Sequence, residues 1–206
     1  MTFMKVCGIT RASDAHHAVT HGASALGFVF WPESPRYITP DKAAIIISEL
    51  QDSIQTVGVF VDQSPEEISR VISETGVSMV QLHGDESSNY AERIQLPLLK
   101  AMTLENAVET MANWLEPTVM LLDANDAVKR GGTGKRIDWT RAAAVASCRR
   151  VILAGGLTDI NIEEAITTVR PYGVDVSSGV EDSPGIKNLN KLACFLDRAR
   201  GVSDDS

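Results

Sequence analysis

The sequence is poor in cysteine, and its few cysteines are widely spaced. Cys7, Cys148 and Cys194 form an odd set with no Cys-x-x-Cys pair among 206 residues. A disulfide framework needs paired thiols, and a structural zinc site needs closely spaced ligands. We therefore expect neither a disulfide framework nor a structural zinc site, and we expect each thiol to act alone.

The sequence also lacks a basic stretch and a long apolar stretch. No run of Lys or Arg is longer than Arg149-Arg150, and the formal net charge is −8, which disfavours nucleic acid as a partner. The longest apolar run is too short to cross a bilayer, and Met-Thr-Phe-Met-Lys leads into a strand-like pattern rather than a signal peptide. These features predict a cytoplasmic protein without a membrane partner.

What is present is a regular alternation of strand-like and helix-like segments. Hydrophobic residues make up 44% of the chain, enough for a sizeable core. Helix starts are indicated at Thr39-Pro40-Asp41, Ser64-Pro65-Glu66-Glu67 and Thr158-Asp159. The eight predicted strands are 4–7, 25–30, 56–61, 79–83, 98–101, 119–123, 151–154 and 173–177.

Eight such units fit either a closed (β/α)8 barrel or an open doubly wound sheet. The barrel needs no edge strands and is favoured, with short helices because 206 residues is near the lower limit for the fold. We predict an α/β TIM barrel of eight parallel strands in a single domain, 1–206, whose residues 203–206 form a frayed tail.

Polar residues at the ends of apolar strands predict a pocket. In a parallel barrel the carboxyl ends of the strands meet at one mouth, which is where Cys7, His83, Asp123 and Ser177 fall. A thiol can act as a base near neutral pH after a modest pKa shift, and Gly8 permits a sharp turn beside it. A carboxylate after four apolar residues is costly unless it is paired or functional. The alternatives are an inert strand cysteine and a loop-capping aspartate.

Two small-residue segments predict a phosphate site. Ala154-Gly155-Gly156-Leu157 and Ser177-Ser178-Gly179-Val180-Glu181 follow the seventh and eighth strands, where such barrels commonly bind phosphate through backbone N–H groups. Two tight turns are the alternative. We predict a small phosphorylated substrate whose phosphate contacts these two segments.

Other residues are candidates for substrate binding. Arg36 is a candidate to pair with a substrate carboxylate, and a solvated surface arginine is the alternative. His83 is a candidate hydrogen-bond donor or second base, and a satisfied strand-end histidine is the alternative. Asp175 lies within the eighth strand and has a structural alternative, in which it turns toward loop amides at the mouth. Gly131-Gly132-Thr133-Gly134-Lys135 lacks the spacing of a nucleotide-binding P-loop and is interpreted as a loop that closes over the substrate, with a surface turn as the alternative.

As an ordered set, these motifs resemble the phosphoribosylanthranilate isomerase family of tryptophan biosynthesis. The resemblance covers residues 5 to about 188. The motifs that carry it are Lys5-Val6-Cys7-Gly8-Ile9-Thr10, Ser34-Pro35-Arg36, Val57-Gly58-Val59-Phe60, Gln81-Leu82-His83-Gly84, Leu122-Asp123, Gly131-Gly132-Thr133-Gly134-Lys135, Gly155-Gly156-Leu157, Val174-Asp175-Val176-Ser177-Ser178-Gly179-Val180-Glu181 and Pro184-Gly185-Ile186-Lys187-Asn188.

The resemblance implies an Amadori rearrangement of N-(5-phosphoribosyl)anthranilate without metal or organic cofactor. It implies Cys7 as general base, Asp123 as general acid, Arg36 as the ligand of the anthranilate carboxylate, and phosphate binding by Gly156, Ser177, Ser178 and Gly179. His83 and Asp175 are expected to line the site. Asp126 is a second carboxylate near Asp123, and strand-end position favours Asp123. We expect a monomer or a homodimer.

Two other hypotheses remain at this stage. One is a related sugar-phosphate barrel enzyme, although Lys100 does not stand at a clear mouth position for a Schiff base, and Cys7 argues against a histidine-pathway isomerase with two aspartates. The other is a barrel that binds phosphate without catalysis, which is disfavoured because both the base and the acid are present.

Overall fold

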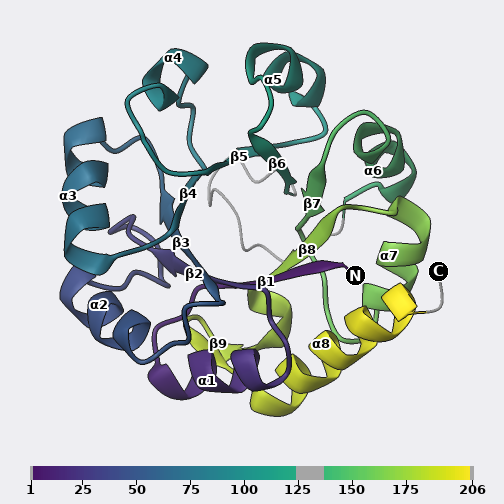
Figure 1. Ribbon diagram of the computed structural model, residues 1–206. Coiled ribbons are helices and arrows are strands. Elements are labelled where there is room, and N and C mark those ends of the chain that lie inside the picture. Colours follow the sequence, from purple (N-terminus) through teal and green to yellow (C-terminus); the bar gives the residue numbers. More distant parts are fainter. Residues whose placement is uncertain (1, 124–136, 205–206) are drawn as a thin grey trace.

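The chain forms a closed barrel of eight parallel strands in a ring of helices (Figure 1), in a computed structural model that describes residues 2–123 and 137–204. The predicted barrel is confirmed, and each predicted strand boundary lies within one residue of the observed one. The strands are β1 Phe3–Cys7, β2 Ala25–Val29, β3 Gln55–Phe60, β4 Met79–Leu82, β5 Leu98–Met102, β6 Val119–Leu122, β7 Val151–Leu153 and β8 Gly173–Val176.

The helices between the barrel strands are short, as expected for a barrel of this length, and a longer helix, α8, follows the last strand. They are α1 Ala12–Thr20, α2 Pro40–Ser48, α3 Pro65–Thr75, α4 Ser88–Ala91, α5 Ala107–Asn113, α6 Trp139–Ala146, α7 Ile162–Val169 and α8 Leu189–Asp204. A 3-10 turn, η1 Ser178–Val180, and a two-stranded ribbon of β9 Glu181–Ser183 and β10 Ile186–Lys187 lie between β8 and α8.

Two of the three predicted helix starts are correct. Pro40 and Pro65 each open a helix, and the Ser64 hydroxyl accepts a hydrogen bond from the N–H of Glu67, as an N-cap residue does. The start predicted at Thr158 is wrong, because α7 begins at Ile162. Thr158 instead opens a turn in which its N–H donates to the Asn161 side chain at 2.8 Å.

Closure of the barrel places β1 between β2 and β8. In the parallel register Cys7 lies opposite Gly27 on β2, and Lys5 lies opposite Asp175 on β8. Alternate residues of a strand point to the same face, so Lys5 and Cys7 share one face of β1. This register brings the first and last strands of the barrel together at the site described below.

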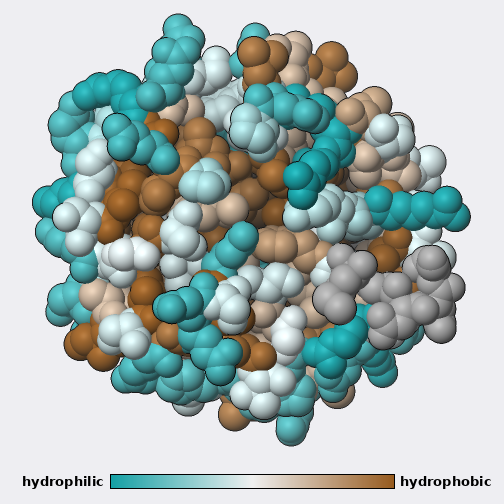
Figure 2. Space-filling view, in the orientation of Figure 1, coloured by the Kyte–Doolittle hydropathy of each residue, from teal (hydrophilic) through white to brown (hydrophobic). Residues whose placement is uncertain are grey.

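Apolar side chains fill the space between the barrel and the helices. Phe28, Phe60 and Phe195 are among the largest fully buried side chains, and α8 packs beside α1 and α7 (Figure 1). On the face shown in Figure 2, hydrophobic residues gather toward the centre and hydrophilic residues form the rim. Within the described residues, no helix is long and apolar enough to cross a membrane.

Helix α8 continues through Asp204. Residues 203 and 204, which were predicted to belong to a frayed tail, are therefore helical. Residues 205 and 206 lie outside the described part of the chain, as do Asp126 and the predicted substrate-closing loop 131–135.

Candidate active site

A pocket of about 410 Å³ opens where the barrel strands end, a size typical of small-molecule sites. Its lining comes from residues in or just after seven of the eight barrel strands, all but β5. All nine predicted site residues line it: Cys7, Arg36, His83, Asp123, Gly156, Asp175, Ser177, Ser178 and Gly179. The rule that carboxyl ends of parallel strands converge therefore located the pocket correctly.

Cys7 is the last residue of β1 and borders the pocket. Gly8 has a φ of 77°, a backbone conformation that glycine adopts without strain, so the predicted turn beside the thiol is present. The N–H groups of Gly8 and Ile9 both donate to the carbonyl of Gly27 at 3.0 Å. Cys7 is 9% exposed, and this burial raises the pKa of its thiol, with the ammonium groups of Lys5 and Lys187 acting in the opposite direction.

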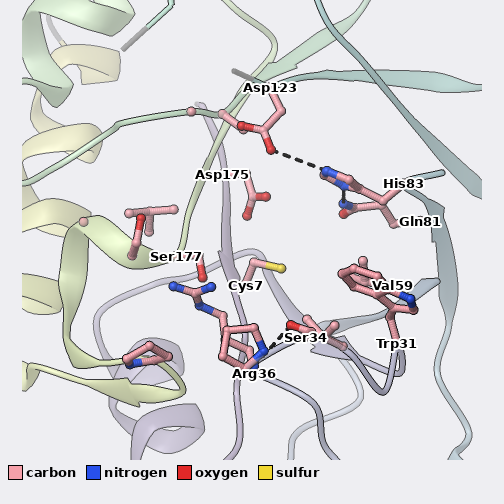
Figure 3. Close-up of a pocket in the computed structure, with 18 of the residues that line it drawn as sticks. Cys7, Trp31, Ser34, Arg36, Val59, Gln81, His83, Asp123, Asp175 and Ser177 are labelled. Atoms are coloured by element: carbon pink, nitrogen blue, oxygen red, sulfur yellow. Dashed lines mark hydrogen bonds and ion pairs between the residues drawn. The ribbon is translucent and has the colours of Figure 1, made fainter. Parts of the chain in front are cut away.

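Asp123 lies across the pocket from Cys7 (Figure 3). It follows β6, and its N–H donates to the carbonyl of Met102 at 2.9 Å. Its Oδ2 atom is 3.4 Å from Nε2 of His83, whose Nδ1 is 2.7 Å from the Gln81 amide nitrogen. With Nδ1 accepting from Gln81, the neutral imidazole carries its proton on Nε2 and presents it to Asp123.

Arg36 is held at the pocket by a partner that the sequence did not reveal. Its Nε and Nη2 atoms donate to the Glu181 carboxylate, the shortest contact being 2.7 Å. Glu181 also accepts from Lys187 Nζ at 2.8 Å. Burial alone would raise the pKa of Glu181, but Arg36 and Lys187 together lower it. The cluster of two cations and one anion leaves a net positive charge beside the pocket.

Lys187 connects this cluster to the ends of β1 and β8. Its Nζ donates to the carbonyl of Cys7 at 2.6 Å and to the carbonyl of Ser177 at 3.3 Å. The ammonium is fully buried, and burial lowers its pKa although Glu181 opposes this. Lys187 thereby fixes the end of β1 relative to the loop after β8.

The segment after β8 borders the pocket and contains backbone N–H groups that its own turn does not use. In the turn η1 the two hydrogen bonds are donated by Val180 and Glu181, so the turn does not use the N–H groups of Ser178 and Gly179. Gly179 is packed against the loop after β7, because a Cβ on it would lie 1.9 Å from the Leu157 carbonyl oxygen. Gly156 lies in that loop and lines the same pocket. This arrangement is suited to binding an anion.

Asp175 does not turn toward loop amides, so that structural alternative is wrong. Its Oδ2 accepts from Lys5 Nζ on the neighbouring strand β1 at 3.0 Å, and its Oδ1 has no hydrogen-bond partner among the described residues. Lys5 is fully buried and was missed by sequence reasoning. The signal available for it was its position two residues before Cys7, on the same face of the strand.

Lys100 is occupied elsewhere, as its sequence position indicated. Its Nζ donates to Glu86 at 2.9 Å and to the carbonyl of Gly84 at 2.6 Å, and it does not line the pocket. Among the described residues, no group of three or more His, Cys, Asp or Glu side chains is arranged to hold a metal ion.

The fold and the pocket define a class: parallel-barrel proteins whose pocket at the carboxyl ends of the strands is lined by a thiol, a carboxyl group and glycine-rich segments. A model of the N-(5'-phosphoribosyl)anthranilate isomerase family matches residues 4–198. The chain belongs to this family. The family and the enzyme class implied by the sequence motifs are thereby confirmed.

Individual relatives are similar to this chain over nearly its full length. The isomerase of this name from Geobacter sp. (strain M21) is 45% identical over 205 residues, covering 98% of this chain and 100% of the relative. A solved isomerase in complex with reduced 1-(o-carboxyphenylamino)-1-deoxyribulose 5-phosphate is 37% identical with a TM-score of 0.86. A solved isomerase from Thermotoga maritima, described as a dimeric protein converted to monomers, has a TM-score of 0.85 at 37% identity. Each structure covers 98% of this chain and is itself covered completely.

Proposed function

We propose that this protein converts N-(5-phosphoribosyl)anthranilate to 1-(2-carboxyphenylamino)-1-deoxyribulose 5-phosphate, an Amadori rearrangement in tryptophan biosynthesis. The observation that carries the proposal is the placement of Cys7 and Asp123 on one pocket together with Arg36 and the segment after β8. Substrate and product are isomers, so the reaction consumes no second reactant.

In the proposed mechanism Asp123 is the general acid and Cys7 the general base. Asp123 gives its proton to the ribose ring oxygen, the C1′–O bond breaks, and the anilino nitrogen lone pair forms an iminium. The Cys7 thiolate then takes the C2′ proton, and the C2′–H electrons form an enolamine. The enolamine tautomerises to the ketone.

The anthranilate carboxylate and the phosphate, at the two ends of the substrate, are bound by different residues. Arg36, aimed by Glu181, binds the anthranilate carboxylate through its remaining N–H groups. The backbone of Gly156, Ser178 and Gly179, with the Ser177 side chain, binds the phosphate. His83 positions the Asp123 carboxyl. The free Oδ1 of Asp175 is placed to accept from a ribose hydroxyl.

We also propose a domain organisation, a location and an oligomeric state for this protein. The chain acts as one domain spanning residues 1–206, in the cytoplasm, on a free small molecule, and as a monomer or a homodimer. The net charge of −8 supports the expectation that neither nucleic acid nor membrane is a partner. Light scattering of the purified protein distinguishes a monomer from a homodimer.

The test is turnover of freshly generated phosphoribosylanthranilate, followed by loss of its fluorescence. Cys7→Ser and Asp123→Asn should each reduce kcat by about 10²-fold or more, as removal of a general base or acid does. Matched controls are Cys148→Ser and Asp182→Asn, which change exposed residues and should retain activity. No turnover by folded wild-type protein would contradict the substrate assignment. Full activity of Cys7→Ser would contradict only the role of the base.

A further inference from the structure

A fully buried lysine lies below the proposed base, and the mechanism above gives it no role. The Lys5 side chain has no exposed surface, and its ion pair with Asp175 measures 3.0 Å. Burying an ammonium is expensive even when it is paired. An apolar residue at this position of the barrel interior would avoid that cost, so the lysine calls for an explanation.

The position of Gly27 brings Lys5 and Cys7 together. Gly27 lies opposite Cys7 in the parallel register of β1 and β2. A Cβ atom on Gly27 would lie 2.9 Å from Cys7 Sγ and 3.2 Å from Lys5 Nζ. The thiol and the ammonium therefore both border the space that a side chain would otherwise fill, and the missing side chain allows them to be neighbours.

We propose that Lys5 is a positioning residue for the base, because its buried ammonium stabilises negative charge on the Cys7 sulfur. The ion pair with Asp175 orients this ammonium, and the absence of a side chain on Gly27 leaves room for it beside the thiol. This role rests on the proposed function, in which Cys7 takes the C2′ proton. Lys5 does not touch the substrate in this role and acts through the thiol alone.

The charges around Cys7 agree with such a role. Burial raises the pKa of the Cys7 thiol, and Lys5 is the largest influence in the opposite direction. Burial would lower the pKa of Lys5, but Asp175 and Cys7 together raise it, so the ammonium keeps its proton. The other charges that face the thiol are Asp175 on β8, which disfavours the thiolate, and Lys187 on β10, which favours it.

Further titratable and charged groups border the same pocket from other elements. They are Arg36 and Glu33 after β2, His83 after β4 and Asp123 after β6. All four are retained in every variant used below, so a change in the thiol can be assigned to Lys5.

The experiment measures the pH dependence of Cys7 alkylation by iodoacetamide, without substrate, in the full chain. Cys148 and Cys194 are exposed and are changed to Ser in every variant, so that Cys7 alone reacts. Lys5→Met removes the ammonium at nearly constant length. Gly27→Ala keeps both groups and forces them apart. Lys100→Met is the matched control, because it removes another buried lysine with its own ion pair away from the thiol.

We expect Lys5→Met to raise the alkylation midpoint by at least about one pH unit, a tenfold loss of thiolate at a given pH. Gly27→Ala should raise it by a smaller amount, and Lys100→Met should leave it unchanged. A variant that only changes the access of iodoacetamide to Cys7 alters the limiting alkylation rate at high pH but not the pH midpoint. If Lys5→Met does not fold, the alkylation midpoint of Gly27→Ala tests the proposal.

An unchanged midpoint in a folded Lys5→Met or Gly27→Ala variant overturns the proposal, and so does an equal shift in Lys100→Met. The alkylation test needs no turnover, so its result is separate from that of the proposed function. A failure of that function would appear instead as an absence of turnover by folded wild-type protein.

Discussion

The guanidinium of Arg36 and the carboxylate of Glu181 form a bidentate ion pair, with Nη2 and Oε2 2.7 Å apart. Neither side chain is freely exposed: the Arg36 side chain is 12% exposed and that of Glu181 is 4% exposed. A long, flexible arginine is thus held in one orientation before a substrate arrives. Preorganisation of this kind strengthens binding because less side-chain entropy is lost in the complex.

Replacing Glu181 with Gln should weaken substrate binding more than catalysis. The variant loses the charge that aims Arg36 and leaves two buried cations without their shared anion. We expect KM to rise about tenfold, corresponding to roughly 1.4 kcal/mol, while kcat falls less than threefold. Steady-state kinetics check this. The control is Asp182→Asn at the exposed neighbouring position. A fall in kcat with unchanged KM would show that Glu181 does not act through substrate binding.

The Glu181 carboxylate should make the free energy of unfolding depend on pH in the acid range. Its pKa is lowered in the folded protein, because the ion pairs outweigh the opposing effect of burial. A lowered pKa stabilises the fold above the unfolded value, roughly 4.3 for Glu, and this contribution is lost as the pH falls through the folded value. The free energy of unfolding from urea titrations should therefore be higher in wild type than in Glu181→Gln near pH 7, and this gap should close below about pH 4. A gap independent of pH would contradict the assignment.

Gly179 should tolerate no side chain. A Cβ there would lie 1.9 Å from the Leu157 carbonyl oxygen and 2.9 Å from its carbonyl carbon. Because these are backbone atoms, the loops after β7 and β8 would have to separate. We expect Gly179→Ala to lose about 1–3 kcal/mol of stability and to weaken competitive inhibition by inorganic phosphate at least fivefold. Gly201→Ala is the control, since a Cβ there meets no atom within 4 Å. Equal phosphate inhibition in wild type and Gly179→Ala would exclude this segment as the phosphate site.

The sequence could predict the barrel and the pocket because both follow from local patterns. Apolar segments ending in Cys7, His83 or Asp123 identify strand ends, and barrel closure brings those ends together. The partners Lys5 with Asp175 and Arg36 with Glu181 are 170 and 145 residues apart in sequence. No local pattern reports which of many charged residues will meet across such distances. The missed start of α7 has a different cause, since a Thr-Asp pair favours a turn as readily as a helix cap.

His83 should control how well Asp123 delivers its proton. His83 Nε2 lies 3.4 Å from Asp123 Oδ2, and its ring is held from behind by Gln81. His83→Phe keeps an aromatic ring but removes the donor, so the carboxyl loses its orientation toward the ring oxygen of the proposed substrate. We expect kcat to fall about 10²-fold, the size of effect that small misplacement of a catalytic group produces, with little change in KM. His83→Gln retains an N–H donor and should recover part of the loss, whereas His16→Phe on the exposed side of α1 should have no effect. If His83→Phe keeps kcat within twofold of wild type, Asp123 is positioned by its other contacts and His83 only lines the pocket.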